Sequence, residues 1–111
     1  MSKDEMADFE QAMSKYYGNE QVKSIIQIKV ETKEADVIAE KVSKLPEIVD
    51  LFLVTGEADL IAKVNFENYG ALKRFIVDKL PKIEGIRDTR TLMVVTTFKE
   101  GGQLRAEEEK S

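Results

Sequence analysis

The sequence predicts an α+β fold, and three patterns along the chain lead to that prediction. Four stretches have the alternating apolar residues or the β-branched composition of strands, at 22–31, 48–55, 59–66 and 89–98. Two stretches between them repeat apolar residues at helical spacing, at 35–45 and 69–80. The pentapeptide KLPEI also reappears as KLPKI, so that a helix end followed by a strand occurs twice. The predicted order of elements is β-α-β-β-α-β.

The first half of the chain predicts a strand followed by a helix. From Val22 to Glu31 the sequence VKSIIQIKVE alternates, which is typical of a strand. Thr32 can cap the next helix, and Glu34 lies in its first turn, where the helix dipole favours a carboxylate. Pro46 is expected to end this helix, because proline has no N–H to donate to the preceding turn.

The second half repeats this plan after a hairpin. The loop between the strands at 48–55 and 59–66 is short enough for an antiparallel pair. The second helix then ends at Pro81, and the last strand covers 89–98. A duplicated split βαβ unit of this kind is the ferredoxin-like fold. Right-handed crossovers would place both helices on one face of a four-stranded antiparallel sheet.

The other face of this sheet is expected to be too apolar for a monomer. If Ile26 and Leu60 face the helices, seven apolar residues face away from them: Ile25, Phe52, Val54, Ile61, Leu92, Val94 and Phe98. We therefore expect a two-fold homodimer that packs sheet to sheet, with all of these except Val94 at the interface. The alternative is that long charged side chains shield the face, namely those of Lys23, Lys29, Lys63 and Arg90.

The two ends of the chain differ in composition from its centre. Residues 1–20 are polar apart from a helical stripe that includes Met6, Phe9 and Met13, which predicts a short N-terminal helix. Residues 21–98 form the expected domain. Residues 99–111 contain Gly101-Gly102 and three consecutive glutamates, and we interpret them as a mobile polar tail.

Composition excludes several classes of function. The 111 residues include no cysteine and no histidine, which removes disulfides, thiolate metal sites and the commonest general base. The formal net charge is −4, and no basic face is apparent, so direct nucleic-acid binding is not expected. The chain has neither an apolar run long enough for a membrane helix nor a signal peptide. We expect a cytoplasmic protein without a cofactor, a metal or a membrane partner.

The hairpin loop in LVTGEADLIA carries more polarity than a turn needs. Gly56 allows a sharp bend and leaves its N–H open to a ligand carboxylate, and Asp59 could meet an ammonium group. Together these groups would suit a free amino acid. The simpler interpretation is that Gly56 takes a positive φ and Asp59 hydrogen-bonds its own turn. Catalysis by carboxylates among Asp50, Glu57, Asp59 and Asp88 has weaker support, because nothing in the sequence brings two of them together. Metal binding by Glu57 and Asp59 is also less supported, because two acids in one loop are too few for a specific site.

The segment GIRDTRTLMVV at 85–95 adds a second motif. TGEADL, then a helix, then this segment resembles the ligand-binding domain of the leucine-responsive regulatory protein (Lrp)/AsnC family, often called RAM, over residues 22–98. The resemblance implies a βαββαβ domain that dimerises through its sheets into an α/β barrel. It also implies further association, often into octamers, and an amino-acid effector that binds near the contact between dimers.

The resemblance also implies a set of effector-binding residues. These are Thr55, Gly56, Glu57, Ala58, Asp59, Thr89, Thr91, Met93 and Val94. Ala58 departs from the family, in which an aromatic residue is frequent, so the wall for the effector side chain is missing. Family regulators carry a helix-turn-helix domain of roughly fifty residues before this one, whereas about 20 residues precede the first strand here. We therefore expect a stand-alone domain that does not touch DNA.

Three functions follow from these observations. The first is an oligomeric amino-acid-binding module that regulates by assembling with a full-length regulator or an enzyme. The second is a pure assembly module whose effector site is vestigial. The third is a small enzyme with a dimeric α/β-barrel fold, which the absence of histidine and tryptophan disfavours. The expected function is therefore regulatory and not enzymatic.

Overall fold

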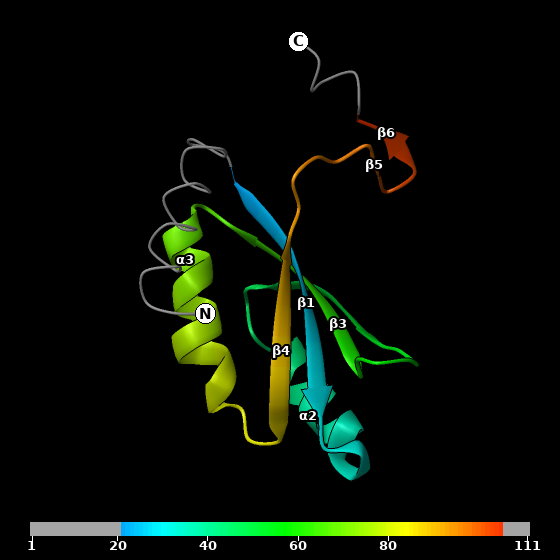
Figure 1. Ribbon diagram of the computed structural model, residues 1–111, viewed down its shortest axis with the longest axis vertical. Helices are drawn as coiled ribbons and strands as arrows, with labels where there is room; N and C mark the ends of the chain where they lie inside the picture. The colour runs from blue at the N-terminus through cyan, green and yellow to red at the C-terminus, as the bar shows by residue number, and fades with distance from the viewer. Residues whose placement is uncertain (1–20, 106–111) are drawn as a thin grey trace.

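The computed structural model of the chain describes residues 21–105, and its centre is a four-stranded antiparallel sheet (Figure 1). The strands are β1 (Val22–Val30), β2 (Ile48–Leu53), β3 (Leu60–Phe66) and β4 (Ile86–Met93). They lie in the order β2-β3-β1-β4, with helix α2 (Ala35–Ser43) between β1 and β2 and helix α3 (Tyr69–Arg74) between β3 and β4. The ferredoxin-like βαββαβ prediction is therefore confirmed.

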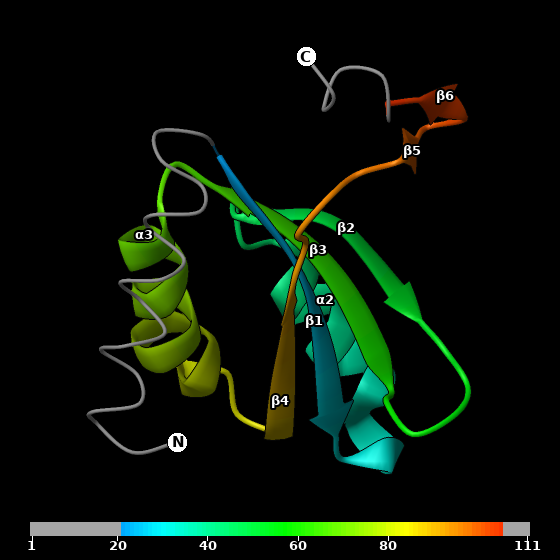
Figure 2. The same cartoon turned by 45° about the horizontal axis from the view of Figure 1, so that its top comes forward.

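The core lies between one face of the sheet and the two helices (Figure 2). Along β1 every second residue is buried, and Ile26 and Ile28 are completely so, as the alternation predicts. Leu60 and Ala62 of β3 lie beside them across the ladder. The helices and the turns after them contribute Ile38, Val42, Leu72, Phe75 and Leu80. The periodicity of the sequence thus places the core correctly.

The helices are less regular than their spacing suggests. Thr32 does not cap α2, because it lies within a 3₁₀ turn (Thr32–Glu34) that precedes the helix, and no side chain caps either start. Asn68 does cap α3, since its Oδ1 accepts a hydrogen bond from the N–H of Ala71 at 2.9 Å. After α3 the chain continues as a π-helical turn (Phe75–Lys79) and a 3₁₀ turn (Leu80–Lys82). Pro81 therefore lies within the 3₁₀ turn that ends this helical segment.

The connection into β4 depends on a glycine. Gly85 has a φ of +101°, and an added Cβ would lie 2.4 Å from Cδ1 of Ile38. Its carbonyl accepts a hydrogen bond from the N–H of Glu31 at 3.1 Å, which ties this turn to the end of β1. Only glycine combines this backbone angle with such close packing against α2.

The last strand is shorter than predicted, and the tail has a structure of its own. β4 ends at Met93, which pairs with Ser24 of β1, and the N–H of Val94 still reaches the carbonyl of Lys23, at 3.0 Å. The following residues, 94–104, lead away from the sheet (Figure 1) and are called the arm below.

The arm ends in a hairpin that the sequence interpretation missed. β5 (Lys99–Glu100) pairs with β6 (Gln103–Leu104) around Gly101 and Gly102, whose φ values of 58° and 81° suit a tight two-residue turn. Residues 99–104 of the predicted mobile polar tail thus contain a short hairpin, and the mobility of this segment stays a prediction. The predicted N-terminal helix at 1–20 and residues 106–111 lie outside the described range.

Candidate functional site

The loop between β2 and β3 has an exposed backbone at Gly56. The φ of this residue is +123°, and an added Cβ would have no heavy atom within 4 Å. Glycine is needed here for the backbone angle alone, in contrast to Gly85. The neighbouring Thr55 and Glu57 are also exposed. The loop therefore presents uncovered backbone to the solvent.

Asp59 closes the loop at its other end. One carboxylate oxygen, Oδ2, accepts a hydrogen bond from the N–H of Val30 at 2.9 Å. The N–H of Asp59 donates to the carbonyl of Ile28 at 3.1 Å, and its carbonyl accepts from the N–H of Val54 at 2.9 Å. This carboxylate is needed because the β1–β3 ladder ends at Ile28 and Leu60, two residues before Val30. Asp59 thus replaces a backbone acceptor, and only Oδ1 remains for another partner.

A pocket of about 330 Å³ lies beside this loop, and it is called the polar pocket below. Its lining is Gln27, Lys29, Glu57, Ala58, Asp88 and Arg90. Gln27 lies opposite Arg90 and Lys29 lies opposite Asp88 in the β1–β4 ladder, so the strand side chains share the sheet face away from the helices. Nζ of Lys29 donates to the carbonyl of Glu57 at 3.1 Å and so links the strand to the loop.

The polar pocket contains residues of both motifs, but the residues predicted from the second motif point to the other face of the sheet. Thr89, Thr91 and Met93 lie opposite Ile28, Ile26 and Ser24, which places them on the helix-facing side of the sheet. Met93 packs against the core, and its sulfur accepts a hydrogen bond from the Ser24 hydroxyl at 3.4 Å. These three side chains therefore do not line the polar pocket, whereas Glu57 and Ala58 do.

Four lining residues were missed by reasoning from the sequence: Gln27, Lys29, Asp88 and Arg90. The signal was present, because successive side chains of a strand point to opposite faces. Asp88 and Arg90 lie on the same face of the sheet as Lys29, so a loop residue that contacts Lys29 also lies on their face. Thr89, between them on the strand, points to the opposite face. Applying the period of two across the paired strands would have found this set.

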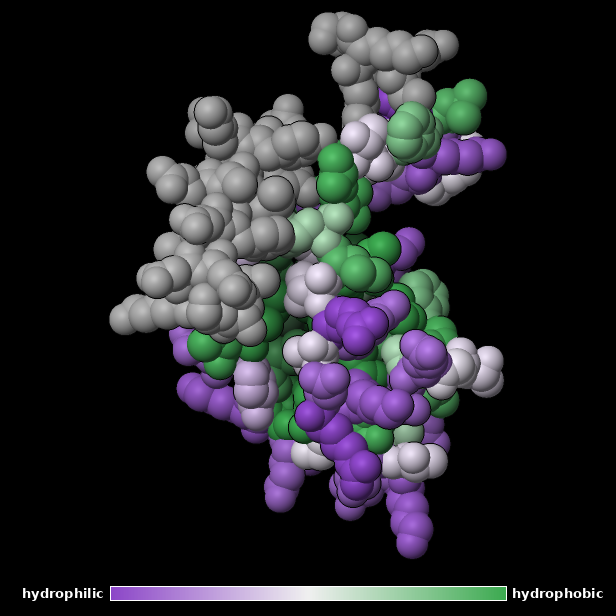
Figure 3. Space-filling model, in the orientation of Figure 1, coloured by the Kyte–Doolittle hydropathy of each residue, from purple (hydrophilic) through white to green (hydrophobic). Residues whose placement is uncertain are grey.

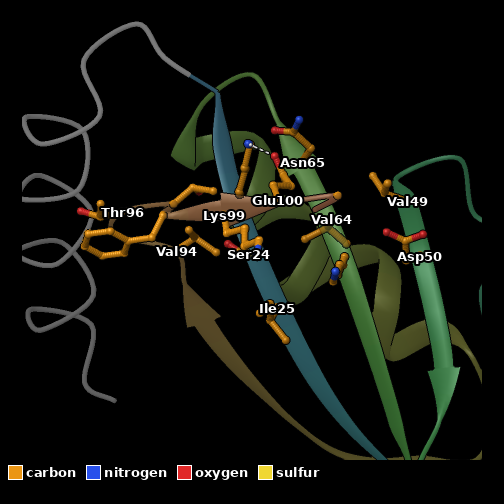
Figure 4. Close-up of a pocket in the computed structure, with 15 residues that line it drawn as sticks. Ser24, Ile25, Val49, Asp50, Val64, Asn65, Val94, Thr96, Lys99 and Glu100 are labelled. Atoms are coloured by element: carbon orange, nitrogen blue, oxygen red, sulfur yellow. Dashed lines mark hydrogen bonds and ion pairs between the residues drawn. The ribbon is translucent and has the colours of Figure 1, made fainter. Parts of the chain in front are cut away.

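A larger concave region lies at the opposite end of the same face, under the arm. Figure 4 shows this pocket of about 750 Å³ between the arm and β1, β2 and β3. Its apolar lining residues are Ile25, Val49, Val64, Val94 and Phe98. Lys23 and Glu100 form an ion pair of 3.0 Å at its rim. The hydrogen bond from Lys23 and its positive charge hold the pKa of Glu100 below the ordinary value of 4.5.

The predicted dimer interface divides between the sheet and the arm. Ile25, Phe52, Ile61 and Leu92 lie on the sheet face away from the helices, here called the far face. Val54 lies in the loop after β2, and Phe98 lies on the arm. In Figure 3 the hydrophobic side chains gather mainly toward the arm, and hydrophilic ones cover the opposite end. Four apolar side chains thus share one face with the polar pocket.

Two other kinds of site were sought within residues 21–105. No group of three or more Asp, Glu, His or Cys side chains in this range could hold a metal ion. No helix there has the length and apolar character to cross a membrane. The functional interpretation below rests on the polar pocket, because it lies beside the loop with the exposed backbone.

Comparison with known proteins decides the family. The Lrp/AsnC ligand-binding domain matches residues 23–104 of the chain. The chain belongs to this family. It is 35% identical to the HTH-type transcriptional regulator FL11 of Pyrococcus furiosus over 81 residues, which are 73% of this chain and 53% of the relative. An uncharacterised HTH-type regulator of Pyrococcus abyssi is 35% identical over 85 residues, or 77% of this chain and 53% of that one.

Solved structures of the Lrp/AsnC family have the same fold. E. coli AsnC superposes with a TM-score of 0.66 and 26% identity, covering 68% of this chain and 52% of its own. A hypothetical protein from Pyrococcus horikoshii has a TM-score of 0.63 and 29% identity, covering 68% of this chain and 92% of its own. The chain spans about half the length of the curated relatives it matches, and those relatives are transcriptional regulators and not enzymes.

Proposed function

We propose that this Lrp/AsnC-type domain is an effector-binding, oligomerising module that recognises a free amino acid beside the β2–β3 loop. The observation that carries the proposal is the juxtaposition of uncovered backbone at Gly56 with the polar pocket. Backbone N–H groups suit a carboxylate, and the pocket carboxylates of Glu57 and Asp88 suit an ammonium group. Asp59 keeps one oxygen for the same purpose. Thr55 belongs to this loop, whereas Thr89, Thr91, Met93 and Val94 would act only from another subunit.

Calorimetry against the twenty amino acids tests this proposal. The full-length chain would be titrated with each one after sedimentation has established its oligomeric state. At least one amino acid is expected to bind with a dissociation constant at or below the millimolar range. If none binds to the intact oligomer, the sensor proposal is wrong and the second candidate, an assembly module, is favoured. That candidate rests on the structural hydrogen bond that Asp59 already makes to Val30.

Assembly through the far face is the second part of the proposal. Phe52 is 49% exposed in the single chain, and Ile25, Ile61 and Leu92 lie on the same face. A second copy packed there would remove these side chains from water, which favours association by roughly 25 cal/mol per Å² of apolar surface. Further association of dimers, for example to an octamer, would bring an effector site next to another subunit. A full-length regulator or an enzyme would be the partner that receives the signal.

The exposed residues offer a matched test of this interface. Phe52→Asp is expected to dissociate the oligomer, because it would place an unpaired charge in the contact. Val37→Asp on α2 is the control, since Val37 is 54% exposed but lies on the helical side. Analytical ultracentrifugation would compare the two variants. Equal sedimentation of both variants and the unmodified chain would contradict the assignment of the interface.

A further inference from the structure

The polar pocket differs from the loop in what it can recognise. The loop offers backbone groups that any amino acid could use, because every amino acid carries the same carboxylate and ammonium. The pocket beside it is lined by side chains, and Ala58 is its only apolar member. An effector held by the loop would direct its own side chain toward charged groups. The pocket therefore determines which class of amino acid can bind.

Among the residues that the structure describes, Arg90 is the cation of this pocket that pairs with no other side chain or backbone group. Nζ of Lys29 is already engaged by the carbonyl of Glu57. The guanidinium of Arg90 forms no hydrogen bond or ion pair with any other residue in the range 21–105. Asp88 precedes it by two residues on the same face, yet the two side chains do not pair. Arg90 is thus positioned to receive an anion from outside the chain.

The charge of the far face also favours an anion. Its strand residues include four cations, Lys23, Lys29, Lys63 and Arg90, against two carboxylates, Asp50 and Asp88. The whole chain, in contrast, has a net charge of −4. The strand side chains of this face therefore favour an anionic ligand over a cationic one, although Glu57 and Asp88 balance Lys29 and Arg90 within the pocket itself.

We infer that the effector is an acidic amino acid, aspartate or glutamate, whose side-chain carboxylate binds the guanidinium of Arg90 in the polar pocket. This inference rests on the proposed function, because it assumes that an amino acid binds beside the β2–β3 loop. Arginine matches a carboxylate with two parallel N–H donors, and Gln27, opposite Arg90 in the ladder, supplies an amide donor. Leucine or methionine would instead place an apolar side chain against charged groups.

Calorimetry with matched ligands tests the ligand class. L-glutamate and L-aspartate would be compared with L-glutamine, L-leucine and L-lysine at low and high salt. The acidic ligands are expected to bind most tightly, and their affinity is expected to fall as salt screens the charges. Tighter binding of leucine or lysine would overturn the inference while leaving the proposed function intact. Binding of no amino acid at all would overturn the proposed function, and the inference with it.

Two arginine variants on β4 test whether Arg90 binds the ligand carboxylate. Arg90→Gln is expected to weaken glutamate binding roughly tenfold to a hundredfold, the range that corresponds to a charged hydrogen bond of about 1.5–3 kcal/mol. Arg87→Gln is the control, because Arg87 lies on the same strand but pairs with Glu31 outside the pocket. Sedimentation and thermal unfolding would confirm that both variants remain assembled and folded. Equal losses in both variants would mean that only net charge matters, and would overturn the role of Arg90.

Discussion

The two faces of the sheet carry similar apolar side chains in very different surroundings. On β3, Leu60 and Ala62 are completely buried beneath the helices, while Ile61 between them lies on the far face and is half-buried. On β1, Ile26 is completely buried and its neighbour Ile25 is not. The helices therefore cover only one side of a sheet that carries apolar side chains on both. The comparison teaches that the fold of one chain leaves a surface that a second copy could complete.

The far face is itself divided between its two ends. At the arm end, the larger pocket is lined by apolar residues such as Ile25, Val94 and Phe98. At the loop end, the smaller pocket is lined almost entirely by polar and charged residues. A two-stranded hairpin such as β5–β6 is marginal on its own in water, which favours contact between the arm and another subunit. We therefore assign effector recognition to the loop end, and we expect the arm to extend the assembly surface that the apolar side chains of the far face provide.

The largest expected effect comes from neighbouring residues on β3. Leu60→Ala is expected to lower the free energy of unfolding by about 2–5 kcal/mol, because it leaves a cavity under the helices. Ile61→Ala should lower it by less in the single chain and weaken association instead. Chemical denaturation at a fixed protein concentration, together with sedimentation, would measure both quantities. Equal destabilisation by the two substitutions would contradict the difference between the faces.

Gly56 and Gly85, which both have a positive φ, are expected to show the next largest difference in the free energy of unfolding. Gly85→Ala is expected to cost about 2–4 kcal/mol, since it adds backbone strain and brings a methyl group against Ile38. Gly56→Ala should cost only about 1 kcal/mol, because its surroundings are open. Denaturation curves of both variants would show the difference. A cost at Gly56 as large as that at Gly85 would mean that the loop is packed against something, such as another subunit.

Asp59 links the β2–β3 loop to the buried residue Val30 of β1, and its substitution is expected to lower the free energy of unfolding by less. Asp59→Ala removes the acceptor for the N–H of the buried Val30 and should cost about 1–3 kcal/mol. Asp59→Asn keeps an oxygen acceptor and should retain most of the stability. Hydrogen exchange at the Val30 amide would report the bond directly. Loss of effector binding in a stable Asp59→Asn protein would show that the charge also serves the ligand.

The fold could be predicted because its determinants are local. Alternation along β1 and helical spacing at 35–45 and 69–80 are each set by neighbouring residues, and burial follows the same pattern. The end of β4 could not be predicted in this way. Residues 94–98 are rich in β-branched side chains, but a strand extends only as far as its neighbour. Val22, the first residue of β1, falls opposite Val95 in the register, so residues 96–98 lie beyond the end of β1. Pairing partners are not visible in the segment itself.

The site was predicted less completely than the fold, for a related reason. The loop at 55–59 was identified because glycine and carboxylates in a hairpin are conspicuous. The role of Asp59 depends on where the β1–β3 ladder ends, two residues before Val30, which no local pattern in the sequence reveals. Thr89 and Thr91 were chosen from the family resemblance, whereas the ladder places Arg90 on the pocket side. Which face a strand residue occupies follows from pairing, not from a motif.

The smallest expected effect concerns the ion pair at the arm end. Lys23 holds the pKa of Glu100 below 4.5, so the pair should be intact at neutral pH and lost as the pH falls through that lowered pKa. Both side chains are largely exposed, so global stability should change little. Hydrogen exchange and side-chain NMR of the arm would follow the titration, with Glu100→Gln as the pH-independent reference. An arm whose exchange does not change with pH or in Glu100→Gln would be held by its apolar contacts alone. The position of the arm would then not depend on the Lys23–Glu100 ion pair. Charged groups would matter for ligand binding at the loop end and not for the structure of the arm end.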